Sequence, residues 1–393
     1  MRVLFILKYY KIGGVETVTH VLANKFQNEG IDSSIFCITK NSNEKILPVL
    51  DSHVILETIE EPCSEKVLVQ RLKDFIVSNK IEVIINQSGE SRSIISIIRK
   101  SIEKLDTKII SVYHNIPGLL KVVYKNRREN NIIRWFLYLL RFYRYGFQMK
   151  TVYERSNAFV LLSDSFKKSF REFIHSDDLK NVYIIPNPIT ITERSNENES
   201  VLPQKQKEII FVGRLSHEHK RVDRILNVWK EIYSEYADWK LTIIGDGPDR
   251  EYLQNMAKSY NLSNVSFVGF SDPIEYYKRA SILLMTSNYE GFPLVLAEAM
   301  SFGIVPVVFG SFSSVRDIVT DGFNGYISNP IKYEFDQQDF VLKLKILLDN
   351  PSVYCECSKN AKNSVLKLGL NNIFDKWKSL LIEVLSTQPT DDR

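Results

Sequence analysis

The first half of the chain alternates short apolar runs with helix-length amphipathic patterns. Residues 1–7 read MRVLFIL, and after the glycine pair Gly13-Gly14 apolar positions recur at helical spacing from Val15 to about Glu29. Further apolar runs follow at helix-sized intervals, at 33–39, 82–88, 108–115, 158–164 and 181–188. Short apolar runs separated by helices indicate a parallel α/β sheet.

The same alternation begins again after a polar segment. Residues 189–207 are rich in polar and charged side chains and poor in large apolar ones, which is typical of a linker. Apolar runs then return at 208–213, 239–244, 264–270, 281–287 and 304–310. We therefore predict two Rossmann-like α/β domains, 1–188 and 208–371, facing each other across a cleft, which is the expected ligand site.

Composition supports this organisation. A chain of 393 residues with 44% hydrophobic and 25% charged residues suits two ordered globular domains and excludes a disordered protein. Its four cysteines are too scattered for a disulfide framework, and Cys-Glu-Cys at 355–357 lacks a second ligand pair for a metal. Because the apolar start is too short for a signal peptide and no run of about 18 apolar residues exists, we expect a cytoplasmic protein.

The positive charge is concentrated in one segment. Residues 119–150 hold eight Lys or Arg and one acidic residue, interleaved with aromatic residues and leucines. Such an amphipathic basic helix suits the surface of a membrane that contains anionic lipid. A solvated helix that packs its aromatic residues on its own domain is the alternative, and composition alone does not separate the two.

Two cations follow the first strand of the second domain. Arg214 comes directly after the run IIFVG, and Lys220 comes six residues later. At the mouth of a parallel sheet, a planar guanidinium and an ammonium can clamp a diphosphate. The alternative is ordinary solvated charge, which is the commoner state of a single Lys or Arg, although the position at a strand end favours a site.

A glycine-rich turn follows the next strand. Residues 245–250 read GDGPDR and resemble the start of a dinucleotide-binding fingerprint, but Arg250 stands where the third glycine is required. Gly247 is therefore only a candidate binding residue. A tight turn before a helix explains the same residues, with Pro248 at the helix start.

Two glutamates stand eight positions apart in the segment SNYEGFPLVLAEAM, residues 287–300. Glu290 precedes Gly291, which permits close approach of a ligand to the backbone, and a helix start near Pro293 offers free N–H groups to a phosphate. Glu298 falls about one and a half turns into this helix. A carboxylate cannot hold a phosphate but accepts hydrogen bonds from sugar hydroxyls, so these are the natural partners of Glu298.

The first domain offers weaker candidates. Gly13 and Gly14 could bring backbone N–H groups to a phosphate, although a strand–helix turn is an equally ordinary reason for them. His114 closes a strand-like run and is a candidate site residue. His217 and His219 lack partners in the sequence, and we interpret them as surface residues rather than metal ligands.

Taken in order, these motifs resemble the retaining glycosyltransferase family 4, of the bacterial capsular or exopolysaccharide biosynthesis type, with the GT-B fold. The resemblance extends from residue 1 to about 330. The matching motifs are GGVE at 13–16, HN at 114–115, NP at 187–188, FVGRLSHEHK at 211–220, IIGDGPDREYL at 243–253, VSFVGF at 265–270, Glu290-x7-Glu298 and DGFNGYI at 321–327.

The resemblance assigns a role to each motif. It implies that Arg214 and Lys220 bind the donor's diphosphate and stabilise the leaving nucleotide, that Glu298 binds the ribose, and that Glu290 contacts the transferred sugar. It also implies that His114 contacts this sugar from the first domain. Further donor contacts are implied for Gly13, Gly14, Gly247, Val268, Phe270, Gly291, Phe292, Pro293, Leu294 and Val295.

The family transfers sugar with retention of anomeric configuration and without a protein nucleophile. The resemblance implies a metal-independent enzyme without a cofactor, which fits the absence of any Asp-x-Asp from the sequence. It also implies a nucleotide-sugar donor, best taken as a UDP-sugar, a lipid-linked or oligosaccharide acceptor, and no nucleic-acid partner. A location at the inner face of the cell membrane follows, with peripheral contact through 119–150. The amphipathic helix within 372–393 is expected to cross back to the first domain.

Three alternatives differ in the residues that they require. A nucleotide-sugar 2-epimerase of the same fold needs additional acid and base residues around the sugar. A dehydrogenase needs the missing third glycine and an acidic residue for the ribose. A nucleotide-sugar-binding subunit without catalysis has no need of the complete set Arg214, Lys220, Glu290 and Glu298.

Overall fold

The computed structural model describes residues 1–10, 13–40, 49–59, 63–118, 132–191, 205–332 and 334–387. The chain divides into two units, and each has its own parallel sheet. Unit 1 takes residues 1–190 and 369–393, and unit 2 takes residues 191–368. The C-terminal segment therefore belongs to the same unit as the N-terminus.

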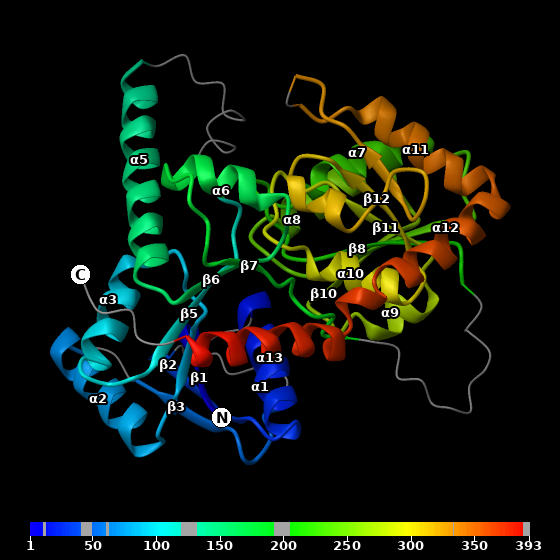
Figure 1. Ribbon diagram of the computed structural model, residues 1–393. Coiled ribbons are helices and arrows are strands. Elements are labelled where there is room, and N and C mark those ends of the chain that lie inside the picture. Colours follow the sequence, from blue (N-terminus) through cyan, green and yellow to red (C-terminus); the bar gives the residue numbers. More distant parts are fainter. Residues whose placement is uncertain are drawn as a thin grey trace. The chain divides into compact units, whose positions relative to one another are not determined.

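Unit 1 is built on a seven-stranded sheet in the order β3-β2-β1-β4-β5-β6-β7, and every pairing within it is parallel (Figure 1). Strands such as 83–86 and 158–161 are buried throughout, because a parallel sheet is covered on both faces. The strands are β1 (Arg2–Tyr10), β2 (Asp32–Lys40), β3 (Ile55–Thr58), β4 (Val83–Asn86), β5 (Lys108–Tyr113), β6 (Ala158–Leu161) and β7 (Val182–Ile184).

Helices flank this sheet, and two of them begin at serine caps. The Ser64 and Ser91 hydroxyls accept hydrogen bonds from backbone N–H groups in the first turns of α2 and α3. The C-terminal helix α13 packs on α1, where the Phe26 and Phe374 rings meet edge to face with centroids 5.5 Å apart. The helices are α1 (Gly14–Asn28), α2 (Glu65–Ser78), α3 (Arg92–Ser101), α5 (Ile132–Glu154), α6 (Phe166–Ile174) and α13 (Leu370–Ser386).

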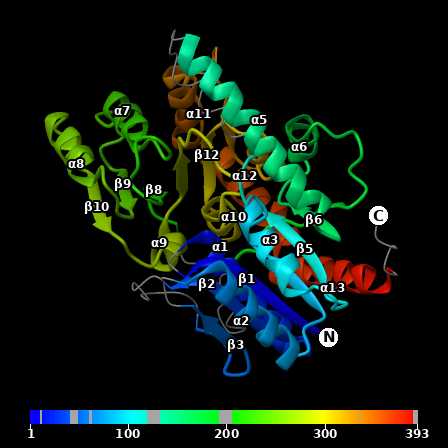
Figure 2. The same ribbon diagram turned by 90° about the vertical axis from the view of Figure 1, so that its left-hand side faces the viewer.

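Unit 2 has a six-stranded parallel sheet in the order β10-β9-β8-β11-β12-β13, packed on an apolar core that includes the fully buried Trp229. Figure 2 shows the neighbouring strands β8, β9 and β10 of this sheet. The strands are β8 (Glu208–Val212), β9 (Lys240–Ile244), β10 (Val265–Gly269), β11 (Ile282–Met285), β12 (Val305–Phe309) and β13 (Tyr326–Ser328). The helices are α7 (Val222–Ile232), α8 (Arg250–Ser259), α9 (Ile274–Arg279), α10 (Leu294–Ser301), η1 (Ser313–Asp317), α11 (Gln337–Asp349), α12 (Pro351–Ser364) and η2 (Leu366–Leu368).

Each sheet has one point where successive crossovers run in opposite directions. It lies between β1 and β4 in unit 1 and between β8 and β11 in unit 2. At such a switch point the two loops leaving the carboxyl ends of the strands diverge, and ligands of open α/β sheets bind there. The prediction of two Rossmann-like α/β domains is confirmed, and the strand order selects the loops that can form a site.

Candidate active site

The loops that leave β8 and β11 are tied together at the switch point of unit 2. The Asn288 backbone N–H donates to the carbonyl of His219, and the Asn288 side-chain amide donates to the carbonyl of Glu218, both over 2.8 Å. The Thr286 hydroxyl donates to the carbonyl of Arg221 over 2.8 Å. Two segments about 70 residues apart in the sequence therefore form one rigid platform.

Lys220 and Glu290 meet on this platform as a buried ion pair. The Lys220 Nζ lies 2.6 Å from Glu290 Oε1, with side-chain exposures of 15% and 9%. Burial opposes ionisation of Glu290, but the Lys220 ammonium and the neighbouring His219 outweigh it and lower the pKa of this carboxyl to about 2. The carboxylate is therefore charged at every physiological pH and accepts hydrogen bonds only.

His219 supports Glu290 from the other side. Its ring stacks on Tyr289 with centroids 4.5 Å apart, and its Nε2 lies 2.8 Å from the Tyr289 carbonyl oxygen, which can only accept. The same Nε2 is 3.6 Å from Glu290 Oε2. The sequence predicts a surface position for His219, and its side chain is 34% exposed, but the contacts with Tyr289 and Glu290 were not foreseen. The signal that could have found it is its position beside Lys220 on the loop after β8.

Glu298 is buried in a separate polar contact. It lies in the second turn of α10, is 5% exposed, and accepts a hydrogen bond of 3.3 Å at Oε2 from the Tyr277 hydroxyl. Tyr277 is fully buried, and this burial together with the Glu298 carboxylate raises its pKa well above the ordinary value. The phenol therefore stays protonated as a donor. Tyr277 has no signal in the sequence that separates it from a core aromatic residue.

The approach to α10 combines compact backbone with a free helix start. Gly291 is half-buried, Phe292 and Pro293 are buried, and Leu294 and Val295 open the helix after Pro293 at the N-cap. The first N–H groups of a helix have no intrahelical acceptor, so this end of α10 suits an anion. The helix start predicted near Pro293 is observed.

Arg214 and the turn after β9 lie at the same edge of the sheet as Lys220. Arg214 is exposed, in contrast to Lys220. A Cβ on Gly245 would lie 1.9 Å from the Gly213 carbonyl oxygen, and one on Gly247 would lie 2.2 Å from the Leu215 carbonyl oxygen. The glycines of this turn are thus required by the close packing of the loops after β8 and β9, whatever they bind.

Two apolar side chains protrude at the end of β10. Val268 is 37% exposed and Phe270 is 57% exposed, on either side of Gly269, whose φ of +78° favours glycine. The Arg250 guanidinium lies beside this turn and pairs with Asp246 over 3.1 Å. An exposed aromatic ring is a surface on which a planar base can stack.

In unit 1 the glycine turn after β1 carries an acidic side chain. Gly13 is the N-cap of α1 with φ of −173°, and a Cβ there would lie 2.4 Å from Glu16 Oε2. Glu16 is buried in the first turn of α1, where a carboxylate is favoured by the helix dipole. Gly14 is exposed at the first position of the helix. The Glu16 carboxylate therefore lies against one flank of Gly13.

His114 follows β5 at the carboxyl edge of the unit 1 sheet. Its Nε2 lies 2.7 Å from Gln87 Oε1, which can only accept, and Gln87 itself follows β4 and is 4% exposed. Burial lowers the pKa of His114 to about 4, so the ring is neutral at physiological pH. Gln87 was not among the residues that the sequence singled out.

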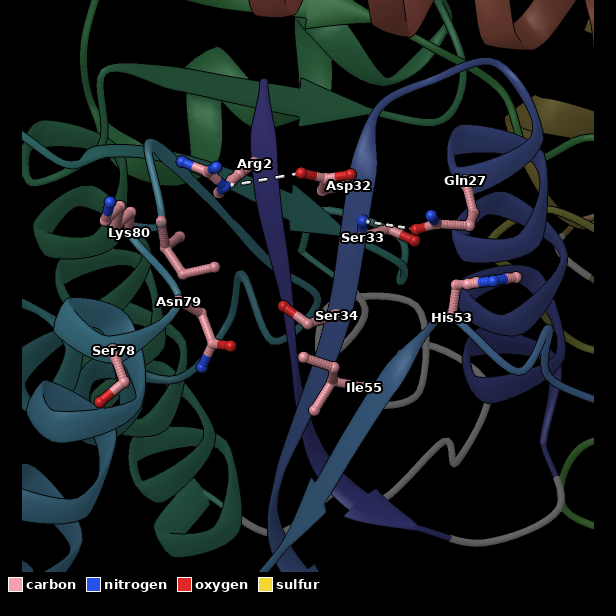
Figure 3. A pocket seen from close by; sticks show the side chains of 11 residues that line it. Arg2, Gln27, Asp32, Ser33, Ser34, His53, Ile55, Ser78, Asn79 and Lys80 are labelled. Atoms are coloured by element: carbon pink, nitrogen blue, oxygen red, sulfur yellow. Dashed lines mark hydrogen bonds and ion pairs between the residues drawn. The ribbon is translucent and has the colours of Figure 1, made fainter.

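A different hollow of unit 1 lies at the amino ends of its strands. This cavity of about 330 Å³ is lined by the first residues of β1, β2 and β3 and by the end of α2 (Figure 3). Its polar groups satisfy one another: Arg2 pairs with Asp32 over 3.5 Å, and the Ser33 N–H donates to Gln27 over 3.1 Å. It faces away from the loops that carry the candidate residues.

The predicted membrane segment is described in part. Residues 119–131, with the basic cluster at 125–128, lie outside the described residues, and residues 132–150 form most of α5. Phe136, Leu140, Tyr143 and Phe147 are 52–60% exposed and follow the i, i+4, i+7, i+11 spacing of one helix face. No helix within the described ranges is both long and apolar enough to cross a membrane.

Comparisons with known proteins identify the family of this chain. Residues 12–193 match the model Glycosyltransferase Family 4, and residues 192–364 match Glycosyl transferases group 1. A glycosyltransferase of Haemophilus influenzae without a characterised activity is 26% identical over 96% of this chain and 98% of its own. The amylovoran biosynthesis glycosyltransferase AmsD of Erwinia amylovora is 26% identical over 94% of this chain and 96% of its own.

Solved structures show the same fold. The Anabaena protein HepE in complex with UDP superposes with a TM-score of 0.75 over 98% of this chain and all of its own, at 15% identity. The two family matches adjoin and together take in residues 12–364, which confirms the family predicted from the ordered motifs. The chain belongs to the glycosyltransferases of group 1 and family 4, with the GT-B fold.

Proposed function

We propose that this enzyme transfers a sugar, with retention of anomeric configuration and without a metal ion, from a UDP-sugar to a lipid-linked or saccharide acceptor in surface polysaccharide biosynthesis. The observation that carries the proposal is the buried Lys220–Glu290 pair at the switch point of unit 2. The relative named for amylovoran biosynthesis supports the polysaccharide assignment, a relative named for a PP-undecaprenol-linked saccharide supports the acceptor class, and the UDP bound to HepE supports the nucleotide.

Lys220 and Arg214 supply positive charge for the diphosphate. As the bond between the anomeric carbon and the phosphate oxygen breaks, negative charge grows on the leaving UDP, and a fixed ammonium stabilises it without reorganisation. The acceptor oxygen bonds to the same face of the anomeric carbon, and its proton passes to the departing phosphate. This sequence of steps needs neither a protein nucleophile nor a divalent cation.

The two glutamates divide the recognition of the donor. Glu290, fully ionised and held by Lys220, accepts hydrogen bonds from hydroxyls of the transferred sugar. Glu298 accepts them from the ribose, with Tyr277 holding one of its oxygens in place. The backbone of 291–295 cradles the sugar and the β-phosphate, while Val268 and Phe270 flank the base.

Unit 1 carries further candidate groups. His114 contacts the transferred sugar, and the N–H groups of Gly13 and Gly14 face the phosphates. The exposed apolar face of α5, flanked by the exposed Arg141 and Arg144, lies on a membrane rich in anionic lipid and brings the enzyme to a lipid-linked acceptor.

The proposal is tested by incubating the protein with a panel of nucleotide sugars and a polyprenol-linked acceptor, while UDP release and the product anomer are followed. We expect a UDP-sugar to be consumed, EDTA to leave the rate unchanged, and the product to keep the donor's anomeric configuration. Activity that EDTA abolishes and manganese restores would refute metal independence. An inverted product would refute the retaining mechanism.

A further inference from the structure

Arg221, the residue after Lys220, has a backbone conformation that is rare for any residue except glycine. Its φ of +52° and ψ of +49° are left-handed, and it is the N-cap of α7. It ends a turn in which the Lys220 and Arg221 N–H groups both donate to the Ser216 carbonyl, over 2.8 and 3.2 Å. Such a conformation is strained and persists only where the surrounding structure fixes it. The strained position lies directly beside the residue that pairs with Glu290.

Two side chains fix the conformation of Arg221. The Thr286 hydroxyl donates to the Arg221 carbonyl over 2.8 Å and lies 3.3 Å from the Lys220 carbonyl oxygen. The Asp223 carboxylate accepts from the Arg221 guanidinium over 2.9 to 3.2 Å. Thr286 is fully buried, so no substrate reaches its hydroxyl. It acts on the site only through the loop that it holds.

Thr286 is itself held at its carbonyl group. The Arg224 guanidinium donates from Nη1 to this carbonyl oxygen over 2.9 Å. The same guanidinium lies over the rings of Phe309 and Phe335, 5.1 and 5.0 Å from their centroids, and these contacts restrict its movement. Arg224 belongs to the first turn of α7. One residue at the end of β11 is therefore bonded both to α7 and to the loop that leads into it.

We propose that Thr286 is a positioning residue for the transfer reaction, because its hydroxyl keeps Arg221 in the left-handed conformation. That conformation holds the Lys220 ammonium against Glu290. This inference rests on the proposed function, in which Lys220 stabilises the leaving UDP. Without the hydroxyl, Arg221 relaxes toward an ordinary φ and the backbone of Lys220 moves with it. The ammonium is then displaced from the charge that grows in the transition state, where a shift of about 1 Å can lower the rate about a hundredfold.

A double-variant cycle tests whether Thr286 acts through Lys220, with UDP release as the assay. Thr286→Val keeps nearly the same shape without the hydroxyl, and it should lower kcat about tenfold in the otherwise unchanged protein. In the Lys220→Met background the same change should lower kcat by less than about twofold, because the group that it positions is absent. Thr286→Ser retains the hydroxyl and should restore most of the rate. A merely structural role would lower kcat by the same factor in both backgrounds.

Thr107→Val is the matched control. The Thr107 hydroxyl is also buried and donates to a backbone carbonyl, that of Ile81, over 3.1 Å, but it lies at the amino end of β5. A thermal melt of each variant checks that it is folded. We expect Thr107→Val to be destabilised like Thr286→Val and to keep the kcat of the wild type. An equal loss of kcat in the two valine variants overturns the proposal.

Substitutions of Arg221 test the conformation without any change at Thr286. Glycine adopts a φ of +52° without strain, whereas the β-branched valine strongly disfavours it. Both substitutions remove the guanidinium, so they differ in the backbone conformation that they permit. Arg221→Gly should keep a kcat at least about fivefold above that of Arg221→Val. This comparison decides the question if Thr286→Val does not fold, and equal rates overturn the proposal.

Failure of this inference differs from failure of the function on which it rests. If Lys220→Met alone transfers sugar as fast as the wild type, the proposed role of Lys220 is wrong and the inference falls with it. If Lys220→Met is impaired, but Thr286→Val loses the same factor in both backgrounds or loses nothing, only the role of Thr286 is overturned.

Discussion

The ion pair between Lys220 and Glu290 allows a quantitative test of the site. Lys220→Met keeps most of the side-chain volume but leaves the carboxylate of Glu290, a residue that is 8% exposed, without its ammonium partner. The fall of the Glu290 pKa from 4.5 to about 2 corresponds to about 3 kcal/mol in favour of the charged form. We therefore expect Lys220→Met to lower the free energy of unfolding by about 2–3 kcal/mol at pH 7.

The double variant distinguishes a broken pair from a lost contact. Removing both charges in Lys220→Met/Glu290→Met leaves no buried charge, so it should be more stable than Lys220→Met by about 2 kcal/mol. Urea unfolding followed by tryptophan fluorescence measures each difference. Lys278→Met breaks an exposed pair with Glu275 of 2.7 Å and serves as the control, with an expected change below about 0.5 kcal/mol.

The pH dependence has a definite sign. The pKa of Glu290 is depressed in the folded state, so its contribution is fully present above about pH 4.5 and is lost as the pH falls through about 2. The stability difference between wild type and Lys220→Met should therefore shrink steadily between these values. A variant destabilised by less than about 0.5 kcal/mol, or a double variant less stable than Lys220→Met, would refute the reasoning.

Other parts of the site make three further predictions. Tyr277→Phe removes the donor to a buried carboxylate and should weaken UDP binding about fivefold by calorimetry, and an unchanged affinity would contradict its positioning role. Gly245→Ala puts a Cβ 1.9 Å from the Gly213 carbonyl oxygen at φ of +138°, and it should lower the free energy of unfolding in urea by about 3 kcal/mol or more. The control Gly322→Ala, at φ of +75° with open space around the new Cβ, should lower it by only about 1 kcal/mol. Equal losses in the two variants would contradict the packing argument. Leu140→Ser/Phe147→Ser removes two exposed apolar side chains from α5 and should reduce cosedimentation with phosphatidylglycerol vesicles at least tenfold, and equal binding would contradict membrane contact.

The sequence predicted which residue types carry chemistry and at which strand ends they lie. Lys220 and Glu290 each follow an apolar run, which places both at the carboxyl edge of a parallel sheet. It could not predict that they touch, because that depends on β8 and β11 being neighbours although β9 and β10 lie between them in the chain. Hydrophobic periodicity locates strands but holds no information on their order in the sheet.

The residues that the sequence did not reveal are supports rather than direct ligands. Gln87, His219 and Tyr277 each hold another side chain through one or two contacts made far along the chain. Their types are common in loops and cores, so neither composition nor spacing distinguishes them. Gly247 shows the reverse: its motif resembles a binding fingerprint, while the close approach of the Leu215 carbonyl already requires a glycine there.

The two units use burial in opposite ways, and this explains why each candidate group suits its proposed partner. Glu290 is buried with a cation 2.6 Å away, so its pKa falls and it stays charged. His114 is half-buried beside a neutral amide, and burial of its ring lowers its pKa, so it is uncharged. Both shifts move titration below the physiological range, which fixes one group as a charged acceptor and the other as a neutral one. Each group therefore keeps its protonation state across physiological pH.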